Sequence, residues 1–452
     1  MKSKTNFVCS NCGAKFAKWA GRCDNCDSWN TLIEQIEDLA EEAMAKSAIL
    51  KGRASGKALS PDKIGDIAPS DAKARLKTEF KDLNAVLGGG ILQGSVSLLA
   101  GQPGIGKSTL LMQICAYVSE KVPVLYISGE ESAGQVKLRA TRLGASSDNL
   151  YFASSTSGND IAKTITSGDY KLVIVDSIQT LTMNEISSAP GTVSQVNNCG
   201  NLIIRAAKET DTAVVIVGHV TKDGSLAGPK VLEHLVDVVL NFEGDRYGGF
   251  KIVRAVKNRF GSTSEVAIFE TKNEGLKEVE NPSAALLAER QNTDGSIILA
   301  TLEGTRGVLV EIQALVNKTN FGYPKRTASG FDLNRLNLLI AVLERRTKLK
   351  LSESDIFVNV VGGLKVQDSA ADLAVCMAIA SACAGRKLNE KYVVFGEVGL
   401  GGEIRSAFRP DQRIAEAKKL GFTKAIGPAT IKDSFVLPVK DLRATLIKYM
   451  EK

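Results

Sequence analysis

A glycine-rich segment, residues 101–109, constrains the fold of this 452-residue chain more than any other part of the sequence. It reads Gly-Gln-Pro-Gly-Ile-Gly-Lys-Ser-Thr and fits the phosphate-binding pattern G-x-x-x-x-G-K-[ST]. An apolar run at 96–100 precedes it and a helical pattern at 109–117 follows, which is the strand, loop and helix order that the pattern needs. Backbone N–H groups of such a loop, and the start of the helix, bind phosphate oxygens. We therefore predict a P-loop that binds ATP through Gly101, Gln102, Pro103, Gly104, Ile105, Gly106, Lys107, Ser108 and Thr109.

Three side chains are predicted to hold the nucleotide and its metal ion. Lys107 should reach the β- and γ-phosphates, and Ser108 should bind Mg²⁺. The apolar run at 171–176 ends in Asp176, about seventy residues after the P-loop, which is a Walker B pattern. This spacing predicts that Asp176 lies beside Mg²⁺ and contacts it through water.

Polar residues also follow two other predicted strands. Glu130 and Glu131 come after one of them, and a carboxylate there can orient and deprotonate the attacking water. Glu130 is the first choice and Glu131 the second, although an acid at this place can also simply complement a helix dipole. The strand at 213–218 ends in His219, which we expect to sense the γ-phosphate and to pass its state to residues 221–229. The alternative is a structural histidine.

Lys257 and Arg259 follow the predicted strand at 251–256. Two cations one residue apart on an extended segment share a face, so both can point at one anion. They are predicted either to act as catalytic cations on the γ-phosphate of a neighbouring subunit or to bind DNA phosphates, and the sequence does not separate these two roles. Simple solvation stays open as a further alternative.

Four cysteines near the N-terminus form two C-x-x-C pairs separated by ten residues. Four thiolates satisfy the tetrahedral preference of Zn²⁺, and a segment this short needs a metal to fold. We predict a closed structural zinc site made by Cys9, Cys12, Cys23 and Cys26; a pair of redox dithiols is the alternative. Trp19 and Trp29 are expected to pack on this unit rather than to stack on bases.

The remaining sequence divides into regions of distinct pattern. Residues 1–30 are the zinc unit, and 31–75 are a predicted linker with a helix at 34–49. From 76 to 272, strands alternate with helices, which predicts an α/β domain with a mainly parallel sheet covered on both faces. The predicted strands are 96–100, 122–128, 171–176, 213–218, 236–242 and 251–256. After a break at 278–294, a second α/β region spans 285–452.

Composition restricts the cellular compartment in which the chain can be expected. We find no apolar run long enough to cross a membrane and no secretory signal, and the other four cysteines are scattered, so we expect a cytoplasmic protein. The formal net charge is +7, and the excess of basic residues lies after residue 290. Basic residues crowd at 345–350, either as a solvated helix face or as a polyanion-binding surface.

The motifs together resemble the bacterial DNA repair proteins called RadA or Sms. The resemblance covers nearly the whole chain and rests on the cysteine unit, the P-loop and four further segments: Ser128–Ser132, Gly218–Lys222, Ala227–His234 and Lys257–Gly261. It implies a RecA-like ATPase core, a homo-hexameric ring, and binding of single-stranded and branched DNA. It also implies branch migration and strand extension together with RecA during recombinational repair. Gln102 departs from the family, which often has an acid there.

The C-terminal region resembles the proteolytic domain of Lon proteases. The matched stretches are 304–313, 362–372 and 395–405. We align the Lon serine position with Ala370, and the segment expected to hold the Lon lysine, 402–405, has no lysine. The resemblance therefore implies a structural domain without proteolysis. An ATP-dependent protease that uses Ser369, and an ATP switch that only binds partners, stay open as alternatives.

Overall fold

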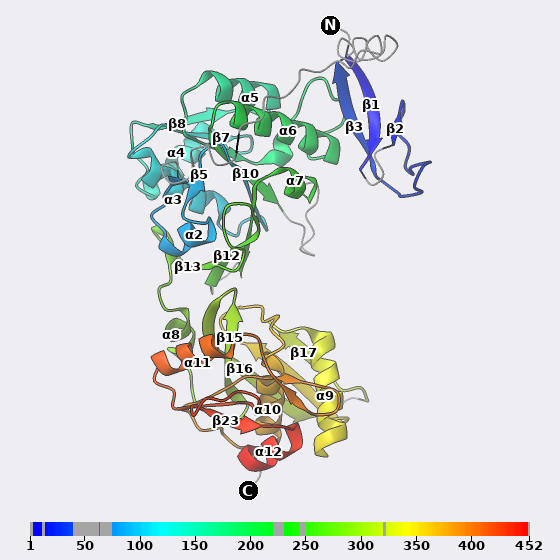
Figure 1. Cartoon of the computed structure of the whole chain (residues 1–452), viewed down its shortest axis with the longest axis vertical. Helices are drawn as coiled ribbons and strands as arrows, with labels where there is room; N and C mark the ends of the chain where they lie inside the picture. The colour runs from blue at the N-terminus through cyan, green and yellow to red at the C-terminus, as the bar shows by residue number, and fades with distance from the viewer. Residues whose placement is uncertain are drawn as a thin grey trace. The chain divides into compact units, whose positions relative to one another are not determined.

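The structure is a computed structural model, and it describes residues 3–10, 14–38, 63, 75–219, 230–244, 250–319 and 322–450. The chain forms two compact units. The first comprises residues 1–242 and 255–263, and the second comprises 243–254 and 264–452. Figure 1 follows the chain through both units.

A parallel sheet forms the centre of the first unit. Its strands lie in the order β11-β6-β10-β9-β7-β8, and all the described pairings among them are parallel. They are β6 (Val96–Gly101), β7 (Val124–Ser128), β8 (Leu150–Ser154), β9 (Leu172–Asp176), β10 (Ala213–His219) and β11 (Val238–Gly244). The central strands are wholly buried, as a sheet covered on both faces requires.

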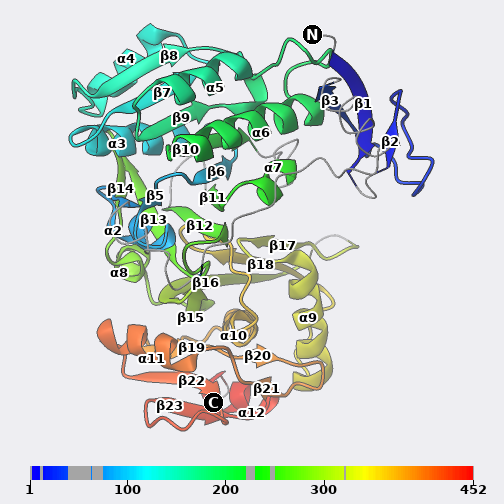
Figure 2. The ribbon, with the colours of Figure 1, turned by 45° about the horizontal axis from the view of Figure 1, so that its top comes forward.

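Helices cover both faces of this sheet, as the sequence predicts (Figure 2). One face packs through Val96, Leu98 and their neighbours against the helices that follow β8, β9 and β10. The helices of that face are α5 (Gly158–Ser167), α6 (Val193–Glu209) and α7 (Lys230–Leu235). The helices α3 (Lys107–Ser119) and α4 (Ala133–Arg142) contact each other and β8. Shorter elements precede or interrupt this pattern: β4 (Arg75–Leu76), α2 (Lys81–Val86), β5 (Ile91–Leu92) and η3 (Ile178–Thr180).

The N-terminal segment is a three-stranded antiparallel sheet in the order β2-β1-β3. Its strands are β1 (Ser3–Cys9), β2 (Lys15–Phe16) and β3 (Leu32–Asp38). The register pairs Cys9 with Leu32 and Ser3 with Asp38. The predicted helix at 34–49 is therefore wrong for residues 34–38, which belong to β3, and its remaining residues, 39–49, lie outside the described residues. Residues 32–38 instead form a strand that pairs antiparallel with β1 along its whole length.

A seven-stranded mixed sheet forms the centre of the second unit, in the order β17-β18-β16-β15-β19-β22-β23. One large apolar core covers it, with the helix α10 buried along most of its length. The sheet strands are β15 (Ser296–Glu303), β16 (Arg306–Lys318), β17 (Arg326–Ser329), β18 (Ser354–Val360), β19 (Tyr392–Val394), β22 (Lys424–Pro428) and β23 (Val436–Val439). The helices are α8 (Pro282–Leu287), α9 (Leu333–Thr347), α10 (Ala371–Ala384), α11 (Pro410–Lys419) and α12 (Leu442–Met450), and β20 (Glu397–Val398) pairs with β21 (Ile404–Arg405).

The boundary between the two units differs from the predicted end of the first domain at 272. Strand β12 (Phe250–Asn258) pairs antiparallel with β13 (Val266–Lys272), which pairs with β14 (Gly275–Glu278). Ile252 and Ile268 belong to the core of the second unit, whereas the residues from 255 to 263 belong to the first. The division therefore passes through β12, which a strand-by-strand prediction assigns to one domain.

Candidate nucleotide and metal sites

The carboxyl ends of four parallel strands bring most of the predicted catalytic residues together. The backbone register pairs Gly101 of β6 with His219 of β10, and Ser128 of β7 with Asp176 of β9. Since these strands lie side by side, the P-loop, the Walker B acid and His219 share one edge of the sheet. The structure brings Lys107, Glu130, Asp176 and His219 together at this edge.

The P-loop backbone has the conformation that its glycines were predicted to allow. Gly104 and Gly106 have φ angles of +76° and +115°, which residues with a Cβ rarely adopt. A Cβ on Gly101 would lie 2.6 Å from the carbonyl oxygen of Phe242, a contact too close for any side chain. Helix α3 begins at Lys107, so its N-terminal N–H groups face the loop. This loop and helix end form a cradle for phosphate oxygens.

The ammonium of Lys107 is buried inside this loop. Its Nζ donates to the carbonyl oxygens of Gly101 and Gln102, at 2.8 Å and 3.0 Å, and contacts Nδ1 of His219 at 3.1 Å. Burial lowers the pKa of Lys107 to about 8, although the carboxylates of Asp176 and Glu130 act in the opposite direction. The hydrogen bonds hold the lysine in place, and its lowered pKa means that it loses its proton more easily than an exposed lysine.

Asp176 accepts hydrogen bonds from two hydroxyl groups. Ser108 Oγ donates to its Oδ2 at 2.7 Å, and Tyr126 Oη donates to the same oxygen at 2.6 Å. Carboxylate and hydroxyl oxygens are the ligands that Mg²⁺ prefers, so Ser108 and Asp176 fit the predicted metal. Tyr126 is not recognisable as a site residue from the sequence, because its position inside an apolar strand is also typical of an ordinary core residue.

Glu130 lies in a polar cluster beside the P-loop lysine. Its Oε1 accepts from Ser177 Oγ and lies 3.3 Å from Nε2 of His219. The hydrogen bond with His219, helped by Ser177 and the charge of Lys107, lowers the pKa of Glu130 to about 2. The two ring nitrogens of His219 thus face Lys107 on one side and Glu130 on the other.

The second candidate, Glu131, has a different environment. Its carboxylate pairs with Arg139 of α4, and both side chains are largely buried. An acid that is already neutralised by a guanidinium is a poor partner for water. Glu130, rather than Glu131, therefore has the position suited to the attacking water.

His219 has a further neighbour that the sequence did not indicate. Gln179 of η3 donates through Nε2 to the backbone oxygen of His219 at 3.4 Å. Gln179 thus links the segment after β9 to the end of β10. The predicted relay loop, residues 221–229, lies outside the described residues.

Lys257 and Arg259 lie at the opposite edge of the parallel sheet, where β6 begins rather than where it ends. Lys257 Nζ donates to the backbone oxygens of Glu233, His234 and Val236, at 2.8, 3.2 and 2.8 Å, and so caps the carboxyl end of α7. Arg259 donates to the buried carboxylate of Asp237 at 3.0 Å.

Asp237 shows which edge of the sheet this is. Its Oδ2 accepts from the backbone N–H of Val96, the first residue of β6, at 3.1 Å. The P-loop begins at the last residue of β6, about 16 Å further along a strand of this length. The structure therefore does not bring Lys257 and Arg259 together with the nucleotide residues of their own subunit.

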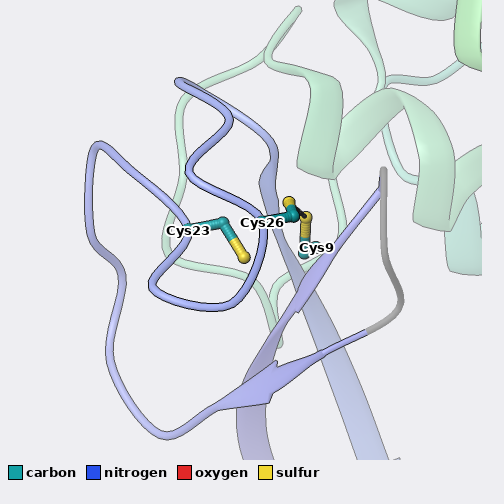
Figure 3. A group of neighbouring side chains, drawn as sticks. All are labelled: Cys9, Cys23 and Cys26. Carbon is teal, nitrogen blue, oxygen red and sulfur yellow. Dashed lines mark hydrogen bonds between the residues drawn. The ribbon is translucent and has the colours of Figure 1, made fainter.

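Three of the four predicted zinc ligands converge in the N-terminal sheet. The sulfur atoms of Cys9, Cys23 and Cys26 all lie within 4.8 Å of one another, and Cys9 Sγ is 3.6 Å from Cys26 Sγ (Figure 3). Sulfur atoms bound to one tetrahedral zinc ion are about 3.8 Å apart, so these distances fit. Cys12 lies outside the described residues.

The two tryptophans of this unit are largely exposed. Trp19 is 59% exposed and Trp29 is 71% exposed. The Arg22 guanidinium lies 5.9 Å from the centre of the Trp29 ring. Neither indole belongs to the small buried cluster of Cys9, Cys23 and Leu32, and their packing on the cysteine unit rather than on bases stays a prediction.

The Lon-like region was predicted to lack a working dyad. Ala370, at the aligned serine position, is fully buried before α10. The neighbouring Ser369 is exposed, and its hydroxyl donates to Glu397 at 3.2 Å. A carboxylate is a much weaker base than a neutral lysine amine, so this pair does not supply an activated nucleophile.

Among the described residues, no helix is long and apolar enough to cross a membrane.

Comparison with known proteins agrees with this arrangement. Three protein families match parts of the chain: AAA domain at 64–225, rubredoxin metal binding domain at 7–34, and subunit ChlI of Mg-chelatase at 336–431. The DNA repair protein RadA of Halalkalibacterium halodurans is 49% identical over 94% of this chain and 93% of its own length. Those of Bacillus subtilis and Pseudomonas aeruginosa are 47% and 44% identical, over 97% and 94% of this chain and 95% and 93% of their own lengths.

The chain belongs to the RadA family of DNA repair proteins. It therefore contains an ATPase domain, for which ATP and Mg²⁺ are the cofactors, and an N-terminal zinc ribbon. When bound, Mg²⁺ would neutralise phosphate charge beside Ser108 and Asp176.

The buried lysine generates a prediction about pH. Below about pH 8 Lys107 carries its proton, and above that value the free protein must take one up before its ammonium can pair with phosphate. We expect the affinity for ATP to be constant from about pH 7 to about pH 8 and to fall by up to about tenfold per pH unit above that. Titration with a fluorescent ATP analogue in Mg²⁺ measures it. Lys107→Arg should remove the slope, because arginine stays charged; a flat profile for the unchanged protein would contradict the prediction.

The sulfur cluster generates a prediction about metal content. Purified protein should contain about one zinc ion per chain, and Cys23→Ser should lose it because three thiolates hold zinc far more weakly than four. Elemental analysis by mass spectrometry measures the metal. Cys115→Ser is the matched control, since this thiol is buried in α3, away from the cluster. Full zinc in the Cys23 variant would show that the cluster is not the site.

Proposed function

We propose that this chain is a DNA-dependent ATPase of recombinational DNA repair. It binds single-stranded and branched DNA and, together with RecA, promotes branch migration and strand extension of recombination intermediates. It acts in the cytoplasm as a homo-hexameric ring. The observation that carries this proposal is the polar cluster of Lys107, Glu130, Asp176 and His219 at one sheet edge, in a chain of the RadA family.

The chemistry of the nucleotide site follows from the positions of its side chains. Lys107 would pair with the β- and γ-phosphates of bound ATP, and Ser108 and Asp176 would hold the Mg²⁺ ion, which supplies positive charge against the phosphates. Glu130 receives the attacking water. With a pKa of about 2 it is a weak base, so it chiefly orients the water by accepting a hydrogen bond. This suits phosphoryl transfer, which depends on positioning and on stabilisation of charge more than on early proton removal.

His219 couples the nucleotide to the rest of the domain. It contacts Lys107 through one ring nitrogen and Glu130 through the other, so a change at either group reaches its ring. The chain continues directly from His219 into residues 221–229, which we propose as the segment that responds to the γ-phosphate. Gln179, bonded to the backbone of His219, holds the end of β10 during this change.

Lys257 and Arg259 are proposed to act on the nucleotide of a neighbouring subunit. Their own P-loop lies at the opposite end of β6, so action within one subunit is not supported. In a ring with head-to-tail contacts, the edge that carries these cations meets a different surface of the next subunit. Two cations near the γ-phosphate there would stabilise the charge of the transition state.

The terminal regions are proposed to support this motor. The zinc ribbon is a closed structural site with no open metal position for catalysis. The C-terminal region, residues 285–452, is proposed as a Lon-protease-like domain without proteolytic activity, which helps to assemble the ring and carries the excess of basic residues. The contact between Ser369 and Glu397, with no lysine in the aligned segment 402–405, supports the loss of proteolysis.

Hydrolysis of ATP should depend on DNA. We expect single-stranded DNA to raise the steady-state rate several-fold at low salt, and the effect to fall steeply as salt is raised, because binding to phosphates releases counterions. Glu130→Gln should abolish hydrolysis but keep ATP binding, since the amide does not carry the negative charge that polarises the water. Hydrolysis that ignores DNA at both salt concentrations, with or without RecA, would favour an ATP switch that only binds partners.

Mixed rings should reveal action between subunits. Lys257→Ala and Lys107→Ala proteins should each be nearly inactive alone. In an equal mixture about a quarter of the sites should become active, because half of the subunits have an intact P-loop and half of their neighbours carry intact cations. Hydrolysis of ATP measures the recovery. A mixture of Glu130→Gln with Lys107→Ala is the matched control and should stay inactive, since both residues serve one site. No recovery in the first mixture would contradict action between subunits.

A further inference from the structure

A buried phenol lies next to the magnesium residues. Tyr126 is the central residue of β7 and only 1% of its surface is exposed. A phenylalanine would fill an apolar sheet equally well, whereas a buried hydroxyl costs free energy unless it is hydrogen-bonded. The hydroxyl of Tyr126 donates to Asp176 Oδ2 at 2.6 Å. The residue therefore has a polar contact that its place in the core does not require.

Asp176 is held from two separate elements. Ser108 at the start of α3 and Tyr126 on β7 both donate to the same carboxylate oxygen, at 2.7 Å and 2.6 Å. A single donor leaves a carboxylate free to rotate about the bond that joins it to the chain. Two donors from different directions fix both the oxygen position and the plane of the group. Oδ1, the other oxygen, is then presented in one orientation.

The surroundings of Tyr126 keep it a donor. Burial, together with the nearby negative charge of Asp176, raises the pKa of Tyr126 above its ordinary value. A carboxylate only accepts hydrogen bonds, so the phenol O–H is the donor in this contact. The positive charge of Arg139, which pairs with Glu131, acts in the opposite direction on the pKa of Tyr126.

We propose that Tyr126 is a positioning residue for Mg²⁺. Its hydroxyl fixes the Asp176 carboxylate in the orientation that receives the hydrated metal ion beside Ser108. This inference rests on the proposed placement of Mg²⁺ at Ser108 and Asp176. Groups that orient metal ligands are typically worth about 10- to 100-fold in metal affinity. Tyr126 thus tunes the Mg²⁺ requirement without touching the nucleotide.

Tyr126→Phe removes only the hydroxyl and tests the inference. Binding of a fluorescent ATP analogue is titrated first in EDTA and then with increasing Mg²⁺. We expect unchanged affinity in EDTA, a Mg²⁺ midpoint raised by about 10- to 100-fold, and hydrolysis that recovers at high Mg²⁺. Tyr151→Phe is the matched control: the same change on the neighbouring strand β8, at a half-exposed tyrosine, should leave the midpoint unchanged.

A second replacement separates the hydrogen bond from packing. Replacing Tyr126 by 4-aminophenylalanine keeps an N–H donor at the same place, and the Mg²⁺ midpoint should return toward that of the unchanged protein. If the phenylalanine variant does not fold, this variant and the unchanged protein are still compared: a midpoint raised as far as that of Asp176→Asn would overturn the inference.

Other outcomes separate this inference from the proposed function. An unchanged Mg²⁺ midpoint in Tyr126→Phe, or weaker binding in EDTA to the same extent as in Mg²⁺, would overturn the role of Tyr126 alone. If binding to the unchanged protein responds to Mg²⁺ but Asp176→Asn alters nothing, the proposed placement of the metal fails instead, and the inference fails with it.

Discussion

Parallel backbone pairing is the constraint on which the nucleotide site depends. The register that sets Gly101 beside His219 and Ser128 beside Asp176 leaves little freedom for where these strands end. A slip of one residue in either ladder would turn the side chains to the opposite face of the sheet. The apolar residues that bury the sheet therefore also fix the positions of the polar groups at its edge. A change that disturbs the packing of the core should disturb the geometry of the site as well.

The polar cluster at this edge is held together by contacts among its own side chains. Lys107, Glu130 and His219 form a continuous chain of contacts, and each of them has a partner from another element. In a partly buried site such preorganised charges act strongly, because no water has to be rearranged around them during reaction. The low pKa of Glu130 is a consequence of the same contacts: the groups that hold it in place also make it a weak base.

The sequence predicted those parts of the site that are encoded locally. The P-loop and Asp176 are recognisable because glycine spacing and an acid at a strand end are local patterns. Tyr126 and Ser177 were not predicted, since their partners come from strands that are distant in sequence and only the sheet order brings them together. Residues 34–38 were misassigned because acids between apolar side chains also suit a helix, and only pairing with β1 decides for a strand.

Lys257 has one more consequence for a ring. Its ammonium satisfies the last carbonyl groups of α7, and α7 follows residues 221–229 in the chain. A cation cannot serve those carbonyls and a neighbour's phosphate at once, so the two uses compete. In the proposed ring, whatever strengthens the last turn of α7 would weaken the binding of ATP to the neighbouring subunit, and ATP bound there would weaken the last turn of α7 by the same free energy. Such coupling would make successive subunits unequal and would favour hydrolysis in sequence around the proposed ring over simultaneous hydrolysis.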